Sequence, residues 1–340
     1  MERHAAWFLP GRQMPPEIAA RYDLIYSWAP PRETLPGTTL LLELCVQDAF
    51  YPATLTDCPV HRTWALWCQA NNVWAHDASG NKLPGWGGTR LGRFATDLSL
   101  PAPWADGVAM ALRTAQGIGM HGLEMDDLGV RPYLIDSPSR GLAAWERSAQ
   151  EMAVAVNTTH APNSVNGYYK YYCPEPMRRR FPIIKAEDSH HARPITLKDW
   201  IEGDDRSIGI LAMDQLGQAV TWEKLVPNDW TKEQIDSWGE TMLATMMLTD
   251  HGRVMIHAFN ADQIGPPAYP GPGTRTPIYC PSFPLAERLG GPLQPAHRGW
   301  KGVWRRQYAH GVVGVNPTDQ PRTCAGIGTV APGTGRVVVE

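Results

Sequence analysis

The sequence of 340 residues lacks an apolar stretch long enough to cross a bilayer. Residues 1–20 also lack the cationic start and following apolar run that mark a secretion signal. Charged residues make up only 19%, the formal net charge is −3, and no basic run occurs. A protein that follows a nucleic-acid backbone or an anionic membrane surface needs such a basic run. We therefore expect a soluble chain with neither nucleic acid nor a membrane among its partners.

Motifs for cofactor, metal and nucleophilic serine chemistry are missing as well. The six cysteines are scattered with no C-x-x-C pair, which leaves zinc ribbons and redox motifs unsupported. No G-x-S-x-G elbow or P-loop occurs, and the first βα turn lacks the dinucleotide fingerprint. The adjacent His190 and His191 have no further ligand at a metal-binding spacing. We expect no cofactor, no metal and free thiols, although Cys58 and Cys68 are close enough in sequence to pair.

The sequence does contain a regular alternation of short apolar runs with amphipathic segments. The runs lack strict polar–apolar alternation, and this lack is typical of strands that are covered on both faces. Strands are expected at residues 5–9, 22–28, 38–46, 122–126, 164–169, 182–187, 207–214 and 253–260. Helices are expected at residues 15–21, 103–115, 140–156, 197–202 and 232–249, the last opened by a capping box of Thr231 and Gln234. This order predicts an α/β fold, and more specifically a single (β/α)8 barrel.

Two segments fall outside this repeat. Residues 58–98 contain a predicted hairpin turn at 77–82, and we interpret them as an insertion after the third strand. A Pro/Gly loop begins at residue 268, and a β-hairpin is predicted around His310–Gly311. We therefore expect a barrel over residues 1–267 and a C-terminal β extension, packed on the barrel, over residues 268–340.

Acidic and amide side chains collect where the predicted strands four to eight end. They are Asp126, Asp127, Asn166, Glu187, Asp214 and Asn260. In a (β/α)8 barrel the carboxyl ends of the strands form the catalytic face. A strand-end Asp taken alone more often caps the next helix, and only the clustering of these residues at one end of the strands favours a catalytic face.

Two carboxylates that face each other across a cleft suit the cleavage of a glycosidic bond. A protonated one donates to the leaving oxygen, and the other attacks the anomeric carbon or activates water. We expect Asp126 as the nucleophile or base and Glu187 as the general acid. Their strands are two apart, so carboxyl groups roughly 5–9 Å apart are expected, a range that covers retaining and inverting geometries.

The other residues of the predicted face would bind the substrate. Asp127, Asn166, Asp214 and Asn260 are expected to bind sugar hydroxyls or to position the catalytic pair. The chain has 14 tryptophans, and a surplus beyond the core is typical of a sugar-stacking cleft, for which Trp28 and Trp86 are candidates. Core packing is the alternative role for each indole. A divalent cation bound by the acidic cluster is an alternative role for the carboxylates.

Several motifs resemble those of a glycoside hydrolase group with a (β/α)8 barrel. "GIGMHGLEMDDLG" is similar to a strand-four signature that ends on a catalytic Asp, and "NNVWAHDASGNKLPGWGG" to a W-x-x-x-D-x-x-G turn. Four further motifs follow in the same order as in that group: "RFATDLSLPAPWADGV", "NSVNG", "IIKAED" and "WRRQYAHGVVGVNPT". The nearest group is the endo-α-1,4-polygalactosaminidase family with its bacterial and phage relatives. The resemblance implies that Asp126 and Glu187 are the catalytic pair and that the substrate is a carbohydrate.

The sequence departs from the group's pattern at His121, Tyr308 and His310, which leaves the sugar and the linkage open. We therefore expect hydrolysis of a glycosidic bond in a polysaccharide or cell-wall-type glycan. The alternative is a non-catalytic glycan-binding or structural barrel of a larger assembly, such as a phage particle. The localisation stays open, with cytoplasmic and virion-associated as the two expectations for a soluble chain.

Overall fold

The computed structural model describes most of the chain. The described residues are 5–8, 20–28, 36–86, 88, 91–129, 131–132, 134–158, 160–166, 173–187, 196–226, 230–259, 275–277, 280–299 and 301–340. Within these ranges, no helix is both long enough and apolar enough to span a membrane.

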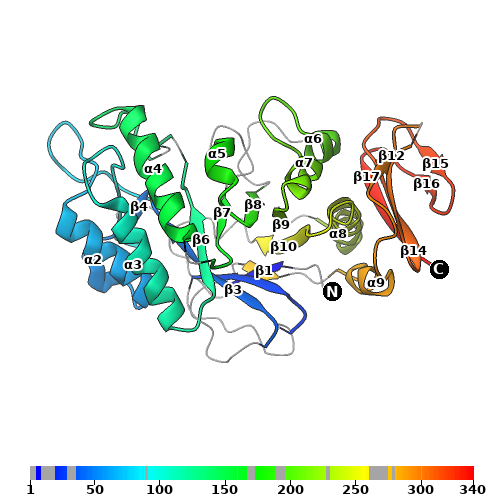
Figure 1. The fold of residues 1–340 in the computed structure, drawn as a ribbon, viewed down its shortest axis with the longest axis horizontal. Coiled ribbons are helices and arrows are strands. Elements are labelled where there is room, and N and C mark those ends of the chain that lie inside the picture. The colour runs from blue at the N-terminus through cyan, green and yellow to red at the C-terminus, as the bar shows by residue number, and fades with distance from the viewer. Residues whose placement is uncertain are drawn as a thin grey trace.

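A nine-stranded sheet forms the centre of the molecule (Figure 1). Its order is β1 (Ala5–Phe8), β2 (Leu24–Ser27), β3 (Thr39–Cys45), β6 (Gly122–Asp126), β7 (Ser164–Asn166), β8 (Ile183–Glu187), β9 (Ala219–Val226), β10 (Arg253–Phe259) and β11 (Arg275–Pro277). Pairing is parallel from β1 to β10, and β11 is antiparallel to β10. The sheet curls so that β1 lies beside β10 and β11. This confirms a mixed α/β fold with a curled parallel sheet, whereas the closed (β/α)8 barrel stays a prediction.

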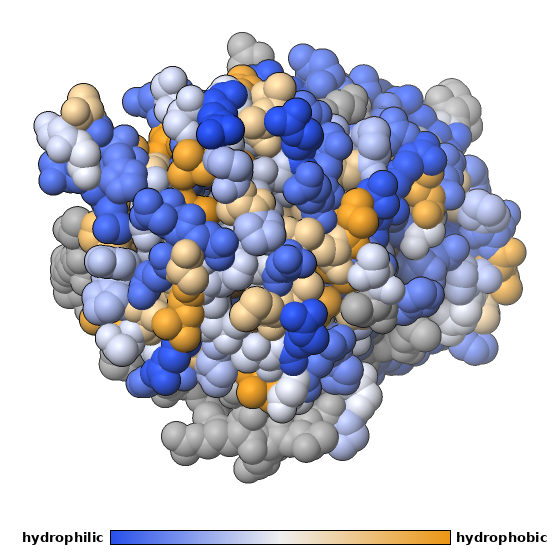
Figure 2. Space-filling view, turned by 60° about the vertical axis from the view of Figure 1, so that its left-hand side comes forward, coloured by the Kyte–Doolittle hydropathy of each residue, from blue (hydrophilic) through white to orange (hydrophobic). Residues whose placement is uncertain are grey.

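Helices cover the outer face of the curled sheet. They are α2 (Pro59–Asn71), α3 (Trp104–Gly117), α4 (Leu142–Asn157), α5 (Glu175–Arg178), α6 (Leu197–Glu202), α7 (Ile210–Gln215) and α8 (Lys232–Met246). Helix α9 (Phe283–Arg288) packs against α8 and the C-terminal strand β17 (Thr334–Val339). Outward-facing strand residues such as Leu42, Leu123 and Ile184 pack with these helices in one large buried core. Helices α2, α3 and α4 lie side by side (Figure 1), and the face that they turn to solvent is mostly hydrophilic with scattered apolar residues (Figure 2).

The predicted helix at 232–249 is confirmed with its capping box, although it ends three residues earlier, at Met246. The Thr231 side chain accepts a hydrogen bond from the Gln234 amide, and the Gln234 side chain accepts one from the Thr231 amide. These reciprocal bonds satisfy two amides that a helix start leaves without intrahelical partners.

The strand prediction at residues 207–214 is wrong. Residues 210–215 form the short helix α7, and the strand that pairs with β8 and β10 is β9, at residues 219–226. Gly209 and Gly217, both with positive φ, flank α7 and let the chain turn sharply at each end. A short apolar run does not by itself distinguish a strand from a buried helical turn, which explains the error.

The insertion predicted at residues 58–98 begins with a helix that the sequence analysis missed. Helix α2 has Cys58 at its N-cap without a side-chain capping bond, and no acidic residue in its first turn. Pro59 at the first helical position is therefore the start signal that this sequence offers, without a capping side chain before it. The predicted turn after it is confirmed, because the Asp77 amide donates to the Asn81 carbonyl at 2.8 Å.

The C-terminal residues form a second sheet with the order β12 (His297–Arg298), β13 (Trp304–Tyr308), β14 (Gly311–Asn316) and β17 (Thr334–Val339). The hairpin predicted around His310–Gly311 is confirmed by the antiparallel pairing of β13 with β14. A smaller hairpin pairs β15 (Arg322–Cys324) with β16 (Gly328–Val330). Helix α8 lies between this sheet and the central sheet (Figure 1). The predicted boundary at residues 267 and 268 lies outside the described residues and stays a prediction.

Candidate functional site

Asp126 is the last residue of β6 and lies half-buried at the carboxyl end of the parallel sheet. The register pairs Met125 with Val165, so Asp126 lies beside Asn166 at the end of β7. The Asn166 amide group donates to Asp126 Oδ1 at 3.1 Å, and the Asp127 backbone amide donates to the same oxygen at 3.1 Å. The structure therefore brings together two of the residues predicted for the site, and it fixes the orientation of the Asp126 carboxylate.

Asp127 turns back toward β3. Its backbone has φ of 58°, in the left-handed region that is uncommon for residues other than glycine. Its Oδ2 accepts a hydrogen bond from the Cys45 thiol at 3.0 Å, and its carbonyl accepts one from Gln47 at 2.9 Å. Burial raises the pKa of Cys45 well above its ordinary value, and Asp48 and Asp127 raise it further, so the thiol keeps the proton that it donates. Asp127 is thus tied to β3 while its amide orients Asp126.

The structure describes Glu187 through its backbone alone. Glu187 is the last residue of β8 and is paired in register with Glu223 on β9. It therefore lies at the same end of the sheet as Asp126, two strands away. The separation of the two carboxyl groups stays a prediction. Asn260 lies outside the described residues.

Asp214 does not join this group. It lies on α7, and its Oδ1 accepts a hydrogen bond from the Asp250 amide at 2.8 Å. Both residues come shortly before a strand, β9 and β10 respectively, so they lie at the amino ends of the parallel strands. Burial raises the pKa of Asp214 above its ordinary value, and the hydrogen bond from the Asp250 amide opposes the shift. The prediction that Asp214 ends the seventh strand is wrong, because a helical turn places it at the opposite end of the sheet from Asp126.

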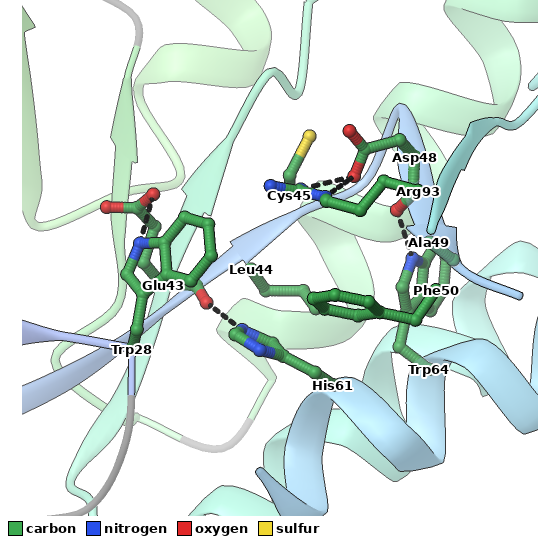
Figure 3. Close-up of a pocket in the computed structure, with 10 residues that line it drawn as sticks. All are labelled: Trp28, Glu43, Leu44, Cys45, Asp48, Ala49, Phe50, His61, Trp64 and Arg93. Carbon is green, nitrogen blue, oxygen red and sulfur yellow. Dashed lines mark hydrogen bonds and ion pairs between the residues drawn. The ribbon is translucent and has the colours of Figure 1, made fainter. Parts of the chain in front are cut away.

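Trp28 and Trp86 form an aromatic corner at the same end of the sheet as Asp126. Figure 3 shows the Trp28 side of this corner, with Glu43 and Arg93 nearby. Trp28 is 8% exposed, and its indole N–H donates to Glu43 Oε1 at 2.7 Å. Trp86 is 38% exposed, and the two indoles meet edge to face with centroids 6.4 Å apart. The Arg93 guanidinium lies 5.2 Å from the Trp28 ring centroid and 5.7 Å from that of Trp86. The structure thus brings together the two tryptophans that the sequence analysis singled out.

A buried ion pair holds this corner in place. Asp48 and Arg93 form the pair, and Asp48 Oδ2 accepts a hydrogen bond from the Trp86 amide at 2.8 Å. Burial raises the pKa of Asp48, whereas the charge of Arg93 opposes that shift. The cavity behind the corner has room for about one water molecule. The cavity is therefore too small to hold a sugar ring.

Polar residues also fill the interior of the curled sheet, and the sequence analysis did not identify them as site residues. Tyr26 donates to Thr221 Oγ1 at 3.1 Å and lies 3.4 Å from Ser164 Oγ, and burial raises the pKa of Tyr26 to about 12. Lys185 Nζ lies 3.3 Å from Glu223 Oε2 and 3.8 Å from Glu43 Oε2. The available signal was a charged residue in the middle of an apolar run, as in "TLLLELC" and "IIKAE".

Metal binding by the acidic cluster was an alternative at the sequence level. Among the residues that the structure describes, no group of three or more His, Cys, Asp or Glu side chains is arranged to hold a metal ion. All six cysteines are free thiols, as expected, and Cys58 is not paired with Cys68.

No protein-family model and no curated protein sequence matches the chain. Among solved structures, the noncanonic maltogenic alpha-amylase AmyB from Thermotoga neapolitana has a TM-score of 0.50 at 11% identity, covering 99% of this chain and 96% of that one. Amy13B from Eubacterium rectale has a TM-score of 0.50 at 7% identity, covering 100% of this chain and 95% of that one. The glycoside hydrolase domain of PelA from Pseudomonas aeruginosa has a TM-score of 0.47 at 14% identity, covering 76% of this chain and 95% of that one. The similarity to AmyB and Amy13B shows the fold.

Proposed function

We propose that this protein is a glycoside hydrolase that cleaves a glycosidic bond in a polysaccharide or cell-wall-type glycan. The observation that carries the proposal is the Asp126 carboxylate, held by Asn166 at the carboxyl end of a curled parallel sheet. Its two hydrogen bonds reach Oδ1, which leaves Oδ2 without a hydrogen-bond partner in the described part of the chain. That oxygen is available for an anomeric carbon or a water molecule. A fold shared with a maltogenic alpha-amylase is compatible with this chemistry.

In the proposed mechanism, Asp126 is the nucleophile or the base and Glu187 is the general acid. Two steps across neighbouring strands span about 10 Å, and inward-facing side chains of a curled sheet converge. If the sheet closes into a (β/α)8 barrel, carboxyl groups roughly 5–9 Å apart follow, as a two-carboxylate mechanism needs. Asn166 holds the Asp126 carboxylate at a fixed angle, and the exposed face of Trp86 offers a stacking surface for a sugar ring.

The test is a screen of purified protein against a panel of polysaccharides with detection of new reducing ends. Asp126→Asn and Glu187→Gln should each lower the rate about 10³-fold or more, because each removes a group that acts on the reacting bond. The melting temperature should shift by less than about 2 °C, since neither change removes buried apolar surface. Asp205→Asn is the matched control, because Asp205 is an exposed carboxylate on the loop before α7 and its loss should leave the rate unchanged.

Three results would contradict the proposal in different ways. Full activity in either variant removes that residue from the mechanism. Binding of a glycan without any product after long incubation favours the non-catalytic barrel. Loss of activity with a chelator, and recovery with Mg²⁺ or Mn²⁺, favours metal-assisted hydrolysis.

A further inference from the structure

Lys185 lies in the interior of the curled sheet with a side chain that is 1% exposed. It sits in the middle of β8, and its ammonium contacts Glu223 on β9 and Glu43 on β3. The ring of Tyr26 on β2 lies 5.7 Å from the same ammonium. Glu124 on β6 is paired in register with Glu43 and is also fully buried. Charged groups from four strands therefore meet at the centre of the fold.

Such a centre is costly for stability. Burying an ion costs several kcal/mol even after relaxation, and apolar residues of similar volume are often neutral or stabilising in its place. The interior of a (β/α)8 barrel is usually filled by Val, Ile and Leu. Charged residues stand in the apolar runs of four strands here, and a departure of this kind is expected where function requires it.

The Lys185 cluster contacts Trp28 and lies in register beside two other residues of the candidate site. Glu43 contacts Lys185 through one carboxylate oxygen and accepts the Trp28 indole N–H with the other. Glu223 contacts Lys185 and is paired in register with Glu187. Lys185 itself is paired in register with Asn166, the residue that holds Asp126.

We propose that Lys185 is a positioning residue that holds Glu43 and Glu223 in place, and through Glu43 fixes the indole of Trp28 at the mouth of the site. The part of this inference that concerns turnover rests on the proposed glycoside hydrolysis. The part that concerns Trp28 does not, because it follows from the contacts of Lys185 and Glu43 alone.

The first test follows the Trp28 indole N–H by NMR, with the resonance assigned through Trp28→Phe. In Lys185→Met the Glu43 carboxylate loses its cation and becomes free to move, so it should release the Trp28 indole. Exchange of the indole N–H proton with solvent should then become about tenfold faster or more. Lys224→Met is the matched control, because Lys224 lies one residue along β9 from Glu223, on the outer face near Trp230 and Trp238. An unchanged exchange rate in Lys185→Met would overturn the proposal.

Lys185→Met leaves the carboxylates of Glu43 and Glu223 without their cation, and this variant could fail to fold for that reason alone. A second variant therefore tests the same inference with fewer uncompensated charges. Lys185→Met combined with Glu223→Gln removes one charge of each sign and still frees Glu43. Faster Trp28 exchange in this double variant supports the proposal, and an unchanged rate overturns it.

The second test separates positioning from mere structural support. At temperatures well below melting, Lys185→Met should lower kcat about 10²-fold with a change in KM below about threefold, since a small misplacement costs about that much. Lys185→Arg keeps the charge and should recover part of kcat. An unchanged kcat together with faster Trp28 exchange would overturn the link to turnover. If the wild-type protein hydrolyses no glycan but Trp28 responds, the proposed function fails and the positioning of Trp28 stands.

Discussion

Cys58 and His61 form a polar pair in the first turn of α2. His61 Nε2 bonds the Glu43 carbonyl at 2.8 Å, which directs the other ring nitrogen away from that carbonyl. Burial raises the pKa of Cys58, but other contacts outweigh burial and lower this pKa overall. They are the charge and the side-chain hydrogen bond of His61, together with the backbone amides of His61 and Val60. The same contacts raise the pKa of His61 although burial lowers it. Each group therefore stabilises the charged form of the other, as at other helix N-termini with a nearby cation.

A lowered pKa makes Cys58 reactive at a lower pH than an ordinary thiol, because the thiolate is the nucleophile. With iodoacetamide, we expect the rate of Cys58 alkylation to rise with pH and to level off earlier than for an ordinary thiol. Cys173 should stay unmodified at pH 7, because burial raises its pKa to about 12. His61→Ala should raise the pKa of Cys58 and slow its reaction at pH 7. Peptide mass mapping after timed alkylation measures this, and equal rates for Cys58 and Cys173 would contradict it.

Among the site residues, Asp126 and Asn166 were predictable from sequence because neighbouring parallel strands end at the same edge. Glu43 and Lys185 were not identified, since a charge inside an apolar run does not reveal its partners on other strands. Asp214 was misplaced because one error in element type moved it to the other end of the sheet.

At the scale of elements, several strands and helices were predicted close to their observed limits, whereas helices α2 and α7 were not. The prediction at residues 122–126 has the same limits as β6, and that at 197–202 has the same limits as α6. Helix α2 was missed although Pro59 marks its first position, because the cysteine before it supplies no capping bond. Helix α7 was predicted as a strand, because a short apolar run fits a strand and a buried helical turn alike.

The capping box of α8 allows a direct test at this scale. Thr231→Ala removes the oxygen that accepts the Gln234 amide, so the free energy of unfolding should fall by about 1 kcal/mol. Thr231→Ser keeps that oxygen and is the matched control, with a change of less than about 0.5 kcal/mol. Urea unfolding followed by circular dichroism measures both variants. Equal loss in the two would show that the hydroxyl does not cap the helix.

At the scale of the whole molecule, α8 joins the central sheet to the C-terminal sheet. Tyr308 on β13 donates to the Met247 carbonyl at 2.5 Å, and the Arg306 guanidinium donates to the Thr249 carbonyl at 2.5 Å and pairs with Asp250. These contacts satisfy the carbonyl of the α8 C-cap, Met247, and that of Thr249 in the turn after it. The C-terminal sheet thus packs on the same helix that covers β9 and β10, so the two sheets should unfold together.

Gly335 on β17 lies where this contact is tightest. A Cβ atom at Gly335 would come within 2.8 Å of the Ala244 Cβ on α8, and the Gly335 amide donates to Thr241 Oγ1 at 3.2 Å. Gly335→Ala should therefore push the sheet away from α8 and lower the free energy of unfolding by about 1–3 kcal/mol. Gly291→Ala is the matched control, because nothing lies within 4 Å of its added Cβ. Differential scanning calorimetry should show one transition that moves as a whole in Gly335→Ala, because a sheet that shares α8 with the central strands cannot loosen without them. A separate early transition, with the main one unmoved, would mean that the two sheets are independent units.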